Sequence, residues 1–298
     1  MKDTENVFLE CALCPRNCRA DRTGKARGYC GVGADLKVAR IALHRWEEPP
    51  ISGMRGSGTV FFAGCNLGCC FCQNHRISRG NSGREYSPRA LADEFMGLEK
   101  QGAHNINLVT AAPFVPRLAE SIRLARRGGL KIPVVYNSSG YEKVETLAML
   151  EGLVEIYLPD LKFASSGRGE RYAGAPDYFN IARLAVGEMI RQCGPAKFDK
   201  SGVMHSGVMI RHLVMPGGVR DSCRCLEWIR DHAPPGILVS LMAQYFPCYR
   251  AAEYPEINRR LTEGEYRAAE EKMRALGLAG YIQDLEAADE SYVPVFDK

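Results

Sequence analysis

The sequence predicts an α/β fold, a partial (β/α)6 barrel of parallel strands with a small Cys-rich N-terminal metal-binding segment. Six short apolar runs alternate with helical patterns from residue 59 onward, which implies parallel strands joined by right-handed crossovers. Residues 1–58 are instead rich in Cys, Arg and Gly, with one short apolar run at 36–43. We therefore expect a Cys-rich segment over 1–58 and the barrel over 59–298, with a doubly wound sheet as the alternative architecture.

The strands are expected where apolar runs suggest burial, at 59–64, 104–110, 131–137, 153–159, 207–215 and 236–243. Helical patterns between and after them start at Ser87, Val115, Tyr141, Tyr178, Ser222 and Thr262. Ser87-Pro88 and the Thr262-x-x-Glu265 capping pattern are good helix starts, and Gly128, Gly194 and Gly277 are good stops. In either architecture, functional groups belong at the C-terminal ends of the strands.

Composition excludes several classes of protein. The chain has 298 residues, 46% hydrophobic and 25% charged, which is ordinary globular usage. Lys and Arg (39) exceed Asp and Glu (35) by only 4, so nothing indicates a nucleic-acid or anionic-lipid partner. The sequence shows no membrane span and no signal peptide, and we expect a cytoplasmic protein. In that compartment, twelve cysteines indicate metal or redox chemistry rather than disulfides.

The first cysteine group follows the first predicted strand. Cys65, Cys69 and Cys72 stand at C-x3-C-x2-C spacing in GCNLGCCFCQN. Three thiolates on a short loop can hold three corners of a [4Fe–4S] cube, which usually has four protein ligands. The fourth iron would then be open to a substrate or cofactor. Cys70 falls off this spacing and is interpreted as packed or spare.

The second cysteine group is Cys11, Cys14, Cys18 and Cys30, in CALCPRNC and GYCG. Four thiolates within twenty residues suit a closed zinc site or a second, fully ligated iron–sulfur cluster, and the spacing does not decide between them. A reduced quartet without metal is the alternative, although a segment so poor in apolar residues needs a staple. The remaining cysteines are Cys193, Cys223, Cys225 and Cys248, and we expect them to be ordinary packed residues. A redox pair of Cys223 and Cys225 is the alternative.

The first group resembles the signature of the radical S-adenosylmethionine (SAM) superfamily, in which an aromatic residue, here Phe71, precedes the third cysteine. CFCQN (70–74) is similar to the C-x-C-H-N of pyruvate formate-lyase activating enzymes, and PDLKF (159–163) to their D-L-K segment. Residues 8–290 resemble uncharacterised relatives of those enzymes that open with CxLCPRNC and carry QYFP.

The resemblance implies a [4Fe–4S] cluster whose open iron binds SAM and cleaves it reductively to a 5′-deoxyadenosyl radical for hydrogen abstraction. It also implies reduced flavodoxin or ferredoxin as electron donor. The hydrogen donor is either a glycine of a glycyl-radical enzyme or an unidentified small molecule or peptide.

Residues expected to contact SAM follow from the motif and the strand ends: Phe71, Asn74, Thr110, Ala111, Ala112, Asn137, Ser138, Ser139, Asp160, Lys162 and Arg211. Thr110–Ala112 replace the superfamily's Gly-Gly-Glu turn, so its acid is missing. Asp160 is expected to bind a monovalent cation or the ribose, or to pair with Lys162 or Arg211. Strand alternation places Arg211 and His212 on opposite faces, and Gln244 and Tyr245 would line the substrate mouth.

Two other functions are weighed. A non-enzymatic iron–sulfur electron carrier would also use cysteines, but it prefers four ligands and needs no barrel-sized scaffold. A zinc hydrolase using His44, His75 or His104 is disfavoured because no H-E-x-x-H or similar spacing is present.

Overall fold

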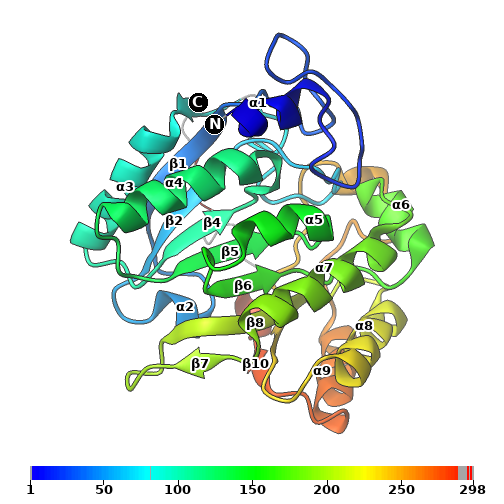
Figure 1. Ribbon diagram of the computed structural model, residues 1–298. Helices are drawn as coiled ribbons and strands as arrows, with labels where there is room; N and C mark the ends of the chain where they lie inside the picture. Colours follow the sequence, from blue (N-terminus) through cyan, green and yellow to red (C-terminus); the bar gives the residue numbers. More distant parts are fainter. Residues whose placement is uncertain (1, 81, 288–293, 295, 297–298) are drawn as a thin grey trace.

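The computed structural model describes residues 2–80, 82–287, 294 and 296, and it contains one ten-stranded sheet (Figure 1). The strand order is β10-β9-β8-β6-β5-β4-β2-β1-β3, with β7 beside β8. Its parallel strands are β2 (Ser57–Phe62), β4 (Ile106–Val109), β5 (Val134–Ser138), β6 (Ile156–Pro159), β8 (Met204–Leu213), β9 (Leu238–Met242) and β10 (Gly280–Ile282). The first six coincide with the predicted apolar runs, which confirms the parallel α/β fold and the partial barrel.

The antiparallel strands lie at one end of this sheet and at β8. β1 (Leu36–His44) pairs with β2, β3 (Arg84–Tyr86) pairs with β1, and the short β7 (Lys197–Phe198) pairs with β8. The expected boundary after residue 58 falls within the first residues of β2. The apolar run before that boundary, at 36–43, is β1 and belongs to the same sheet.

All six predicted helical regions are present: α3 (Pro88–Lys100), α4 (Val115–Arg127), α5 (Val144–Leu147), α7 (Tyr178–Cys193), α8 (Val219–His232) and α9 (Glu263–Ala275). The Ser87 side chain caps α3, and Thr262 and Glu265 form the expected capping box at α9. The sequence did not predict α1 (Lys2–Leu9), α2 (Pro49–Ser52) and α6 (Ser166–Ala173). Single-turn 3₁₀ helices lie at η1 (Ala112–Phe114), η2 (Ala148–Leu150), η3 (Ala251–Glu253) and η4 (Leu285–Ala287).

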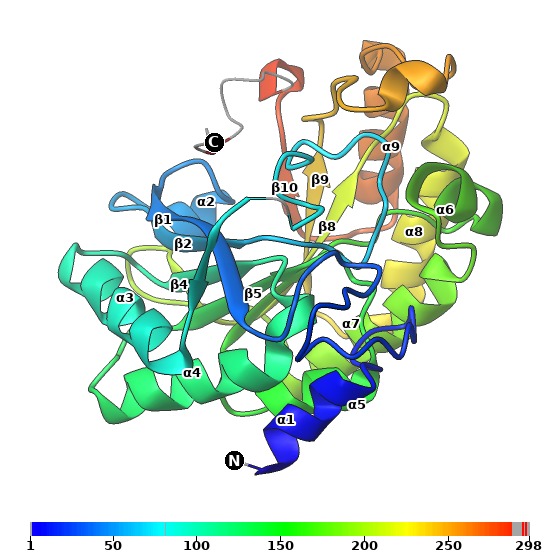
Figure 2. The same ribbon diagram turned by 90° about the horizontal axis from the view of Figure 1, so that it is seen from above.

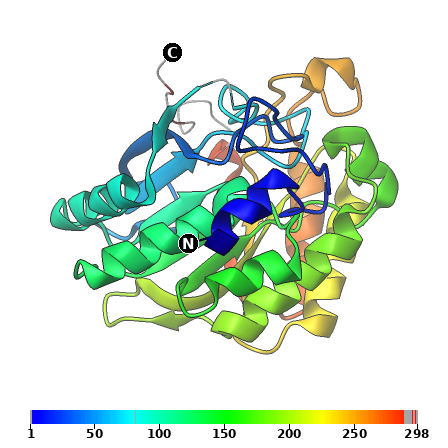
Figure 3. The ribbon, with the colours of Figure 1, turned by 45° about the horizontal axis from the view of Figure 1, so that its top comes forward.

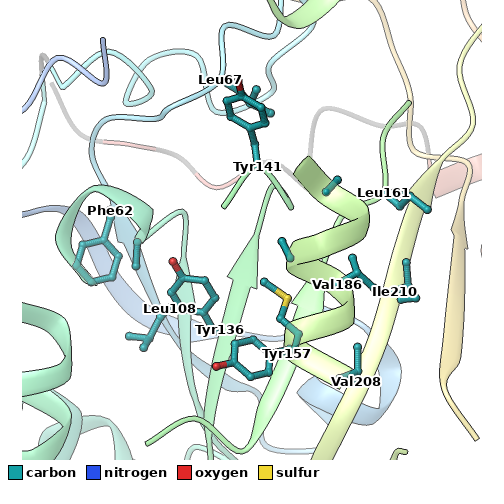
Figure 4. Close-up of a cluster of buried hydrophobic side chains, with 14 of the residues drawn as sticks. Phe62, Leu67, Leu108, Tyr136, Tyr141, Tyr157, Leu161, Val186, Val208 and Ile210 are labelled. Atoms are coloured by element: carbon teal, nitrogen blue, oxygen red, sulfur yellow. The ribbon is translucent and has the colours of Figure 1, made fainter. Parts of the chain in front are cut away.

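The main core lies between the outer face of the sheet and its covering helices. Strand alternation turns Tyr136, Tyr157 and Ile210 toward Val186 of α7, and all four are buried (Figure 4). Burial of each such side chain contributes about 1.5–3 kcal/mol. This face is therefore committed to packing, and the opposite face of each strand remains for the barrel interior.

The interior is closed at the N-terminal end of the strands by α2. Figure 2 shows this short helix on the opposite side of the sheet from α4 and α5. Its Ile51 is fully buried in a small inner core with Val135, Ile156 and Met209. Access to the interior is thus left to the C-terminal ends of the strands and to the open side of the barrel. No helix within the described residues is long and apolar enough to cross a membrane.

Candidate active site

The segment after β2, residues 63–75, is called the cysteine loop below. Its Cys65, Cys69 and Cys72 line a cavity of about 250 Å³ at the C-terminal ends of the strands. Nine of the eleven residues expected to contact SAM line the same cavity: Phe71, Asn74, Thr110, Asn137, Ser138, Ser139, Asp160, Lys162 and Arg211. The other two, Ala111 and Ala112, are buried in the turn after β4 and do not line it. Residues far apart in the sequence therefore converge as the sequence predicted.

The three cysteines are chemically alike in this cavity. Burial raises the pKa of Cys65, Cys69 and Cys72 to about 12, and the positive charge of Lys162 opposes this rise at each of them. The thiols are therefore protonated at neutral pH until a metal displaces their protons. Cys70 is also buried but does not line the cavity, in agreement with its place outside the ligand spacing.

A second segment, residues 244–250, holds the cysteine loop in place. The Gln73 side chain donates to the Gln244 carbonyl at 2.9 Å, and the Cys248 thiol donates to the Phe71 carbonyl at 3.3 Å. The rings of Phe71 and Tyr245 lie 5.9 Å apart, and the Tyr245 hydroxyl donates to the Ile257 carbonyl. Tyr245 is thus a packed aromatic residue whose hydroxyl is held by the Ile257 carbonyl, and both Gln244 and Tyr245 line the cavity as expected.

Asp160 and its neighbours form the charged wall of the cavity. One carboxylate oxygen of Asp160 accepts from Lys162 at 2.6 Å, and the other accepts from Arg211 Nε at 2.9 Å. Burial alone would raise the pKa of Asp160, but Arg211 and Lys162 hold it below its ordinary value. Asp160 is therefore an ion-paired carboxylate, the third of its expected roles. Arg211 and His212 face opposite ways as predicted, and His212 Nδ1 lies 2.6 Å from the Leu161 carbonyl.

Glu47, which no motif in the sequence marks, reaches this wall from the segment between β1 and α2. Its carboxylate accepts from Asn107 and Asn137, each at 2.9 Å, and from Arg211 at 3.1 Å. Four polar side chains from different elements are thereby joined inside the barrel. WEEPP, in which Glu47 lies, has the composition of an exposed turn, so only the long-range packing identifies this residue.

The turn after β4 differs from the superfamily pattern. Thr110 has φ 61°, a left-handed conformation that favours glycine and is costly for a β-branched residue. Its amide donates to the Asn137 carbonyl at 3.0 Å, which holds the turn against β5. The turn keeps a conformation suited to glycine although the residue has changed, and Glu47 supplies a carboxylate elsewhere in the same cavity.

A second cavity of about 1050 Å³ adjoins the first and shares Trp46, Glu47, Gln244 and Ala287 with it. It is also lined by charged residues on the open side of the barrel, among them Arg45, Glu48, Arg55 and Asp199. The first cavity is small, so this larger space is where a further molecule has room.

The segment after α1, which carries the N-terminal cysteines, lies beside the cysteine loop (Figure 3), and its Arg16 donates to the Asn66 carbonyl at 2.8 Å. Cys11 and Cys30 are buried, Cys14 is half-buried and Cys18 is exposed. As placed, no three His, Cys, Asp or Glu side chains in the described part of the chain are close enough together to enclose a metal ion. In a [4Fe–4S] cube each iron atom has its own ligand. The sulfurs of Cys65, Cys69 and Cys72 therefore need to surround a cavity and need not converge on a single metal ion.

Comparison with known proteins decides the family. An uncharacterized protein of Methanocaldococcus jannaschii is 34% identical over 275 residues, which cover 89% of this chain and 74% of the relative. A family model described as the radical SAM superfamily matches residues 59–164, from β2 past β6. The chain belongs to the radical SAM superfamily. Membership implies a [4Fe–4S] cluster and SAM, and the residues described above fit both groups, since three thiols and nine expected contacts border one cavity.

One solved structure shares this fold. HydG, a maturase of the [FeFe]-hydrogenase and 14% identical, matches over 74% of this chain and 49% of its own length, with a TM-score of 0.51. A domain of pyruvate-formate lyase-activating enzyme from Bacteroides vulgatus is 13% identical over 57% of this chain and 91% of its own, with a TM-score of 0.42. The HydG match shows a shared radical SAM fold only.

Proposed function

We propose that this protein is a radical SAM enzyme in which Cys65, Cys69 and Cys72 ligate the [4Fe–4S] cluster. The observation that carries the proposal is that these three thiols share one cavity with the polar residues from β4, β5, β6 and β8. When bound and reduced, the cluster cleaves SAM to methionine and a 5′-deoxyadenosyl radical that abstracts a hydrogen atom. The chain supplies the ligands, holds SAM in one orientation and excludes water.

The charged wall supports a binding role for Arg211 and Lys162. The positive charge of Lys162 lowers the pKa of all three thiols, and Arg211 donates to Asp160, Glu47 and Asn137. A carboxylate such as that of SAM would meet N–H donors that are already held in position here. A monovalent cation beside Asp160 has less support, because Lys162 and Arg211 already neutralise this carboxylate.

The proposed reaction is tested with protein reconstituted anaerobically with iron and sulfide. With dithionite and SAM it should release 5′-deoxyadenosine, and addition of SAM should change the electron paramagnetic resonance (EPR) spectrum of the reduced cluster. The Cys70→Ala variant is the matched control and should keep both properties. Reconstituted protein whose spectrum ignores SAM and which forms no 5′-deoxyadenosine would refute the proposal.

For the hydrogen donor, we favour a glycine of a glycyl-radical enzyme, on the similarity of CFCQN and PDLKF to the activases, with a cytoplasmic flavodoxin or ferredoxin as reductant. The second cavity supports a donor that enters from the open side of the barrel, since it meets the first at Glu47 and Gln244. A glycyl-radical EPR doublet on a co-encoded partner would support activation. Deuterium transfer into 5′-deoxyadenosine from a small molecule would favour the alternative.

A further inference from the structure

The N-terminal cysteines lie in a segment that is held by tight turns. Between α1 and β1, the amides of Arg19 and Asn17 donate to the carbonyls of Cys11 and Cys14 at 3.0 and 3.1 Å. Asn17 and Arg19 have left-handed φ values of 44° and 51°, which are costly for residues with a side chain. These turns fold the chain back on itself and bring the cysteines of CALCPRNC together.

The cysteines of this segment are neighbours in space. A side-chain carbon on Gly28 would lie 2.7 Å from the Cys18 sulfur and 3.9 Å from the Cys30 sulfur. The Cys18 thiol also donates to the Cys11 carbonyl at 3.9 Å, so Cys18 has both Cys11 and Cys30 as neighbours. Each cysteine has a single side-chain torsion before its sulfur, so a change of rotamer can draw the sulfurs onto a shared metal.

A buried cation borders these thiols. Arg22 is 2% exposed and donates to the carbonyls of Val32, Gly33 and Pro113 at 3.2, 2.6 and 2.8 Å. It also donates to the Cys11 sulfur at 3.4 Å. Within the described residues it forms no ion pair with a carboxylate. The guanidinium also lies 5.1 and 5.7 Å from the centres of the Phe8 and Phe114 rings. Rings and carbonyls carry no full negative charge, so a thiolate at Cys11 would supply the missing counter-charge of this buried cation.

We propose that Cys11, Cys14, Cys18 and Cys30 bind one metal centre through four thiolates, with Arg22 as its buried counter-charge. Four thiolates around Zn²⁺ or a [4Fe–4S]²⁺ core leave two negative charges, which Arg22 partly neutralises. With four neutral thiols instead, Arg22 would keep its three carbonyl acceptors but would have no negative charge beside it. The metal-loaded state is therefore the one in which the buried charges are balanced.

The position of this centre gives it a structural role beside the proposed SAM site. Arg16, between Cys14 and Cys18, donates to the Asn66 carbonyl at 2.8 Å, one residue beyond Cys65. A side-chain carbon on Gly64 would lie 2.8 Å from the Cys30 carbonyl, so the two cysteine-bearing segments are in direct contact. A metal that fixes the N-terminal segment would stiffen the support of the cysteine loop.

The test uses the full chain with Cys65, Cys69 and Cys72 all replaced by Ser, purified without oxygen. Metal analysis should find about one Zn, or the iron and sulfide of one cluster, per chain. Further replacement of Cys14 and Cys30 by Ser should remove it, whereas Cys193→Ser with Cys223→Ser in the same background should not. A triple variant without stoichiometric metal would overturn the proposal.

Thiol alkylation gives a readout on the triple variant itself, in case the further variants fail to fold. Cys18 is exposed, so accessibility alone predicts that iodoacetamide modifies it readily. Ligation predicts the opposite: mass spectrometry should find Cys18 protected until a chelator is added, while half-buried Cys223 reacts independently of chelator. Rapid modification of Cys18 in metal-containing protein would contradict its role as a ligand. Neither readout uses SAM, so this proposal and the proposed function can fail independently.

Discussion

The two cysteine groups use the same residue in opposite surroundings. Cys65, Cys69 and Cys72 border a cavity whose far wall carries Asp160 and Arg211. The N-terminal cysteines lie instead in a packed segment, where Arg22 is tied to three backbone carbonyls and to Cys11. Cys65, Cys69 and Cys72 thus border a cavity with polar groups held in place, whereas the N-terminal cysteines are surrounded by a packed segment.

This difference teaches how ligand number and surroundings together predict the role of a metal site. Structural sites are closed by four protein ligands, whereas catalytic sites keep a position open toward a cavity. Three thiols beside polar strand ends match the open case, and four thiols beside a buried arginine match the closed case. The two groups should therefore differ in how strongly the loss of one cysteine lowers SAM cleavage.

The largest effect is expected for Cys69→Ala. Loss of a cluster ligand should lower 5′-deoxyadenosine formation by more than about 100-fold, beyond the 10- to 100-fold typical of groups that only orient a ligand. Cys18→Ala, in the other group, should retain most SAM cleavage per SAM-site cluster. Product is measured by chromatography after reconstitution. Equal losses in the two variants would show that the groups do not have separate roles.

Asp160→Asn should have the next largest effect. The substitution removes the negative charge that pairs with the buried cations Arg211 and Lys162. Breaking a buried ion pair in this way lowers the free energy of unfolding by about 3–5 kcal/mol. SAM affinity, measured by calorimetry, should fall about tenfold or more because Arg211 and Lys162 lose their fixed positions.

The salt dependence of SAM binding distinguishes the roles of Asp160. Because both of its oxygens are already paired, the parent should bind SAM equally in Na⁺ and K⁺. Asp231→Asn, in an exposed pair with Arg230, is the control and should leave SAM affinity unchanged. Affinity that depends on the identity of the monovalent cation in the parent but not in Asp160→Asn would instead assign a cation to this carboxylate.

Local patterns in the sequence predict most of the fold. Apolar runs locate six parallel strands, and side-chain caps locate the starts of α3 and α9. The missed elements have weak local signals: β10 has three residues, β7 has two, and α6 contains two glycines within SGRGERYA. Such elements form because neighbouring strands and helices are already in place, which no local pattern records.

The candidate site was predictable where a motif or a strand end marks it. The cysteine spacing and the positions of Asn137, Asp160 and Arg211 all follow from that rule, and these residues do converge on one cavity. Glu47 does not follow from it, because it lies before the first barrel strand and enters the interior from the side of α2. The partner of Asp160 does not follow from it either. An ion pair, a bound cation and the ribose differ in interatomic distances, which the spacing of residues in the sequence does not give.

Glu48→Gln should change how stability depends on pH. Glu48 is 5% exposed, and its pKa is raised to about 7, mainly by burial and also by Glu47 and Asp160, against the opposing charge of Arg211. Between pH 4.5 and 7 the folded protein therefore holds a proton that the unfolded chain has lost, so this group's contribution to stability falls as pH rises through that window. A shift of this size corresponds to about 3 kcal/mol.

Urea unfolding of parent and Glu48→Gln from pH 5 to 8 measures this contribution. The free energy of unfolding of the variant should rise relative to that of the parent as pH rises, because glutamine stays neutral. Glu142, whose pKa burial also raises to about 7, is present in both proteins and cancels in the difference. Parallel pH profiles of the two proteins would contradict the raised pKa of Glu48.

The smallest effect is expected for Arg16→Lys, at the contact between the two cysteine groups. Arg16 donates to the carbonyls of Asn66 and Ala173 at 2.8 and 3.3 Å, and its guanidinium lies 4.0 Å from the centre of the Tyr29 ring. Lysine keeps the charge but cannot bond two carbonyls as a planar fork while it stacks on a ring, so the free energy of unfolding should fall by about 1–2 kcal/mol.

Arg19→Lys is the matched control for this contact. It is an exposed residue of the same segment and forms a surface salt bridge with Glu10, so its change should be within about 0.5 kcal/mol. If Arg16→Lys is as mild as Arg19→Lys, the N-terminal segment is held to the cysteine loop by other contacts. If it is larger, and SAM cleavage nevertheless falls by less than about threefold, the contact stabilises the fold without directing the chemistry. That outcome would show that the structural influence of the N-terminal segment ends at Asn66, one residue from Cys65, the first ligand of the proposed cluster.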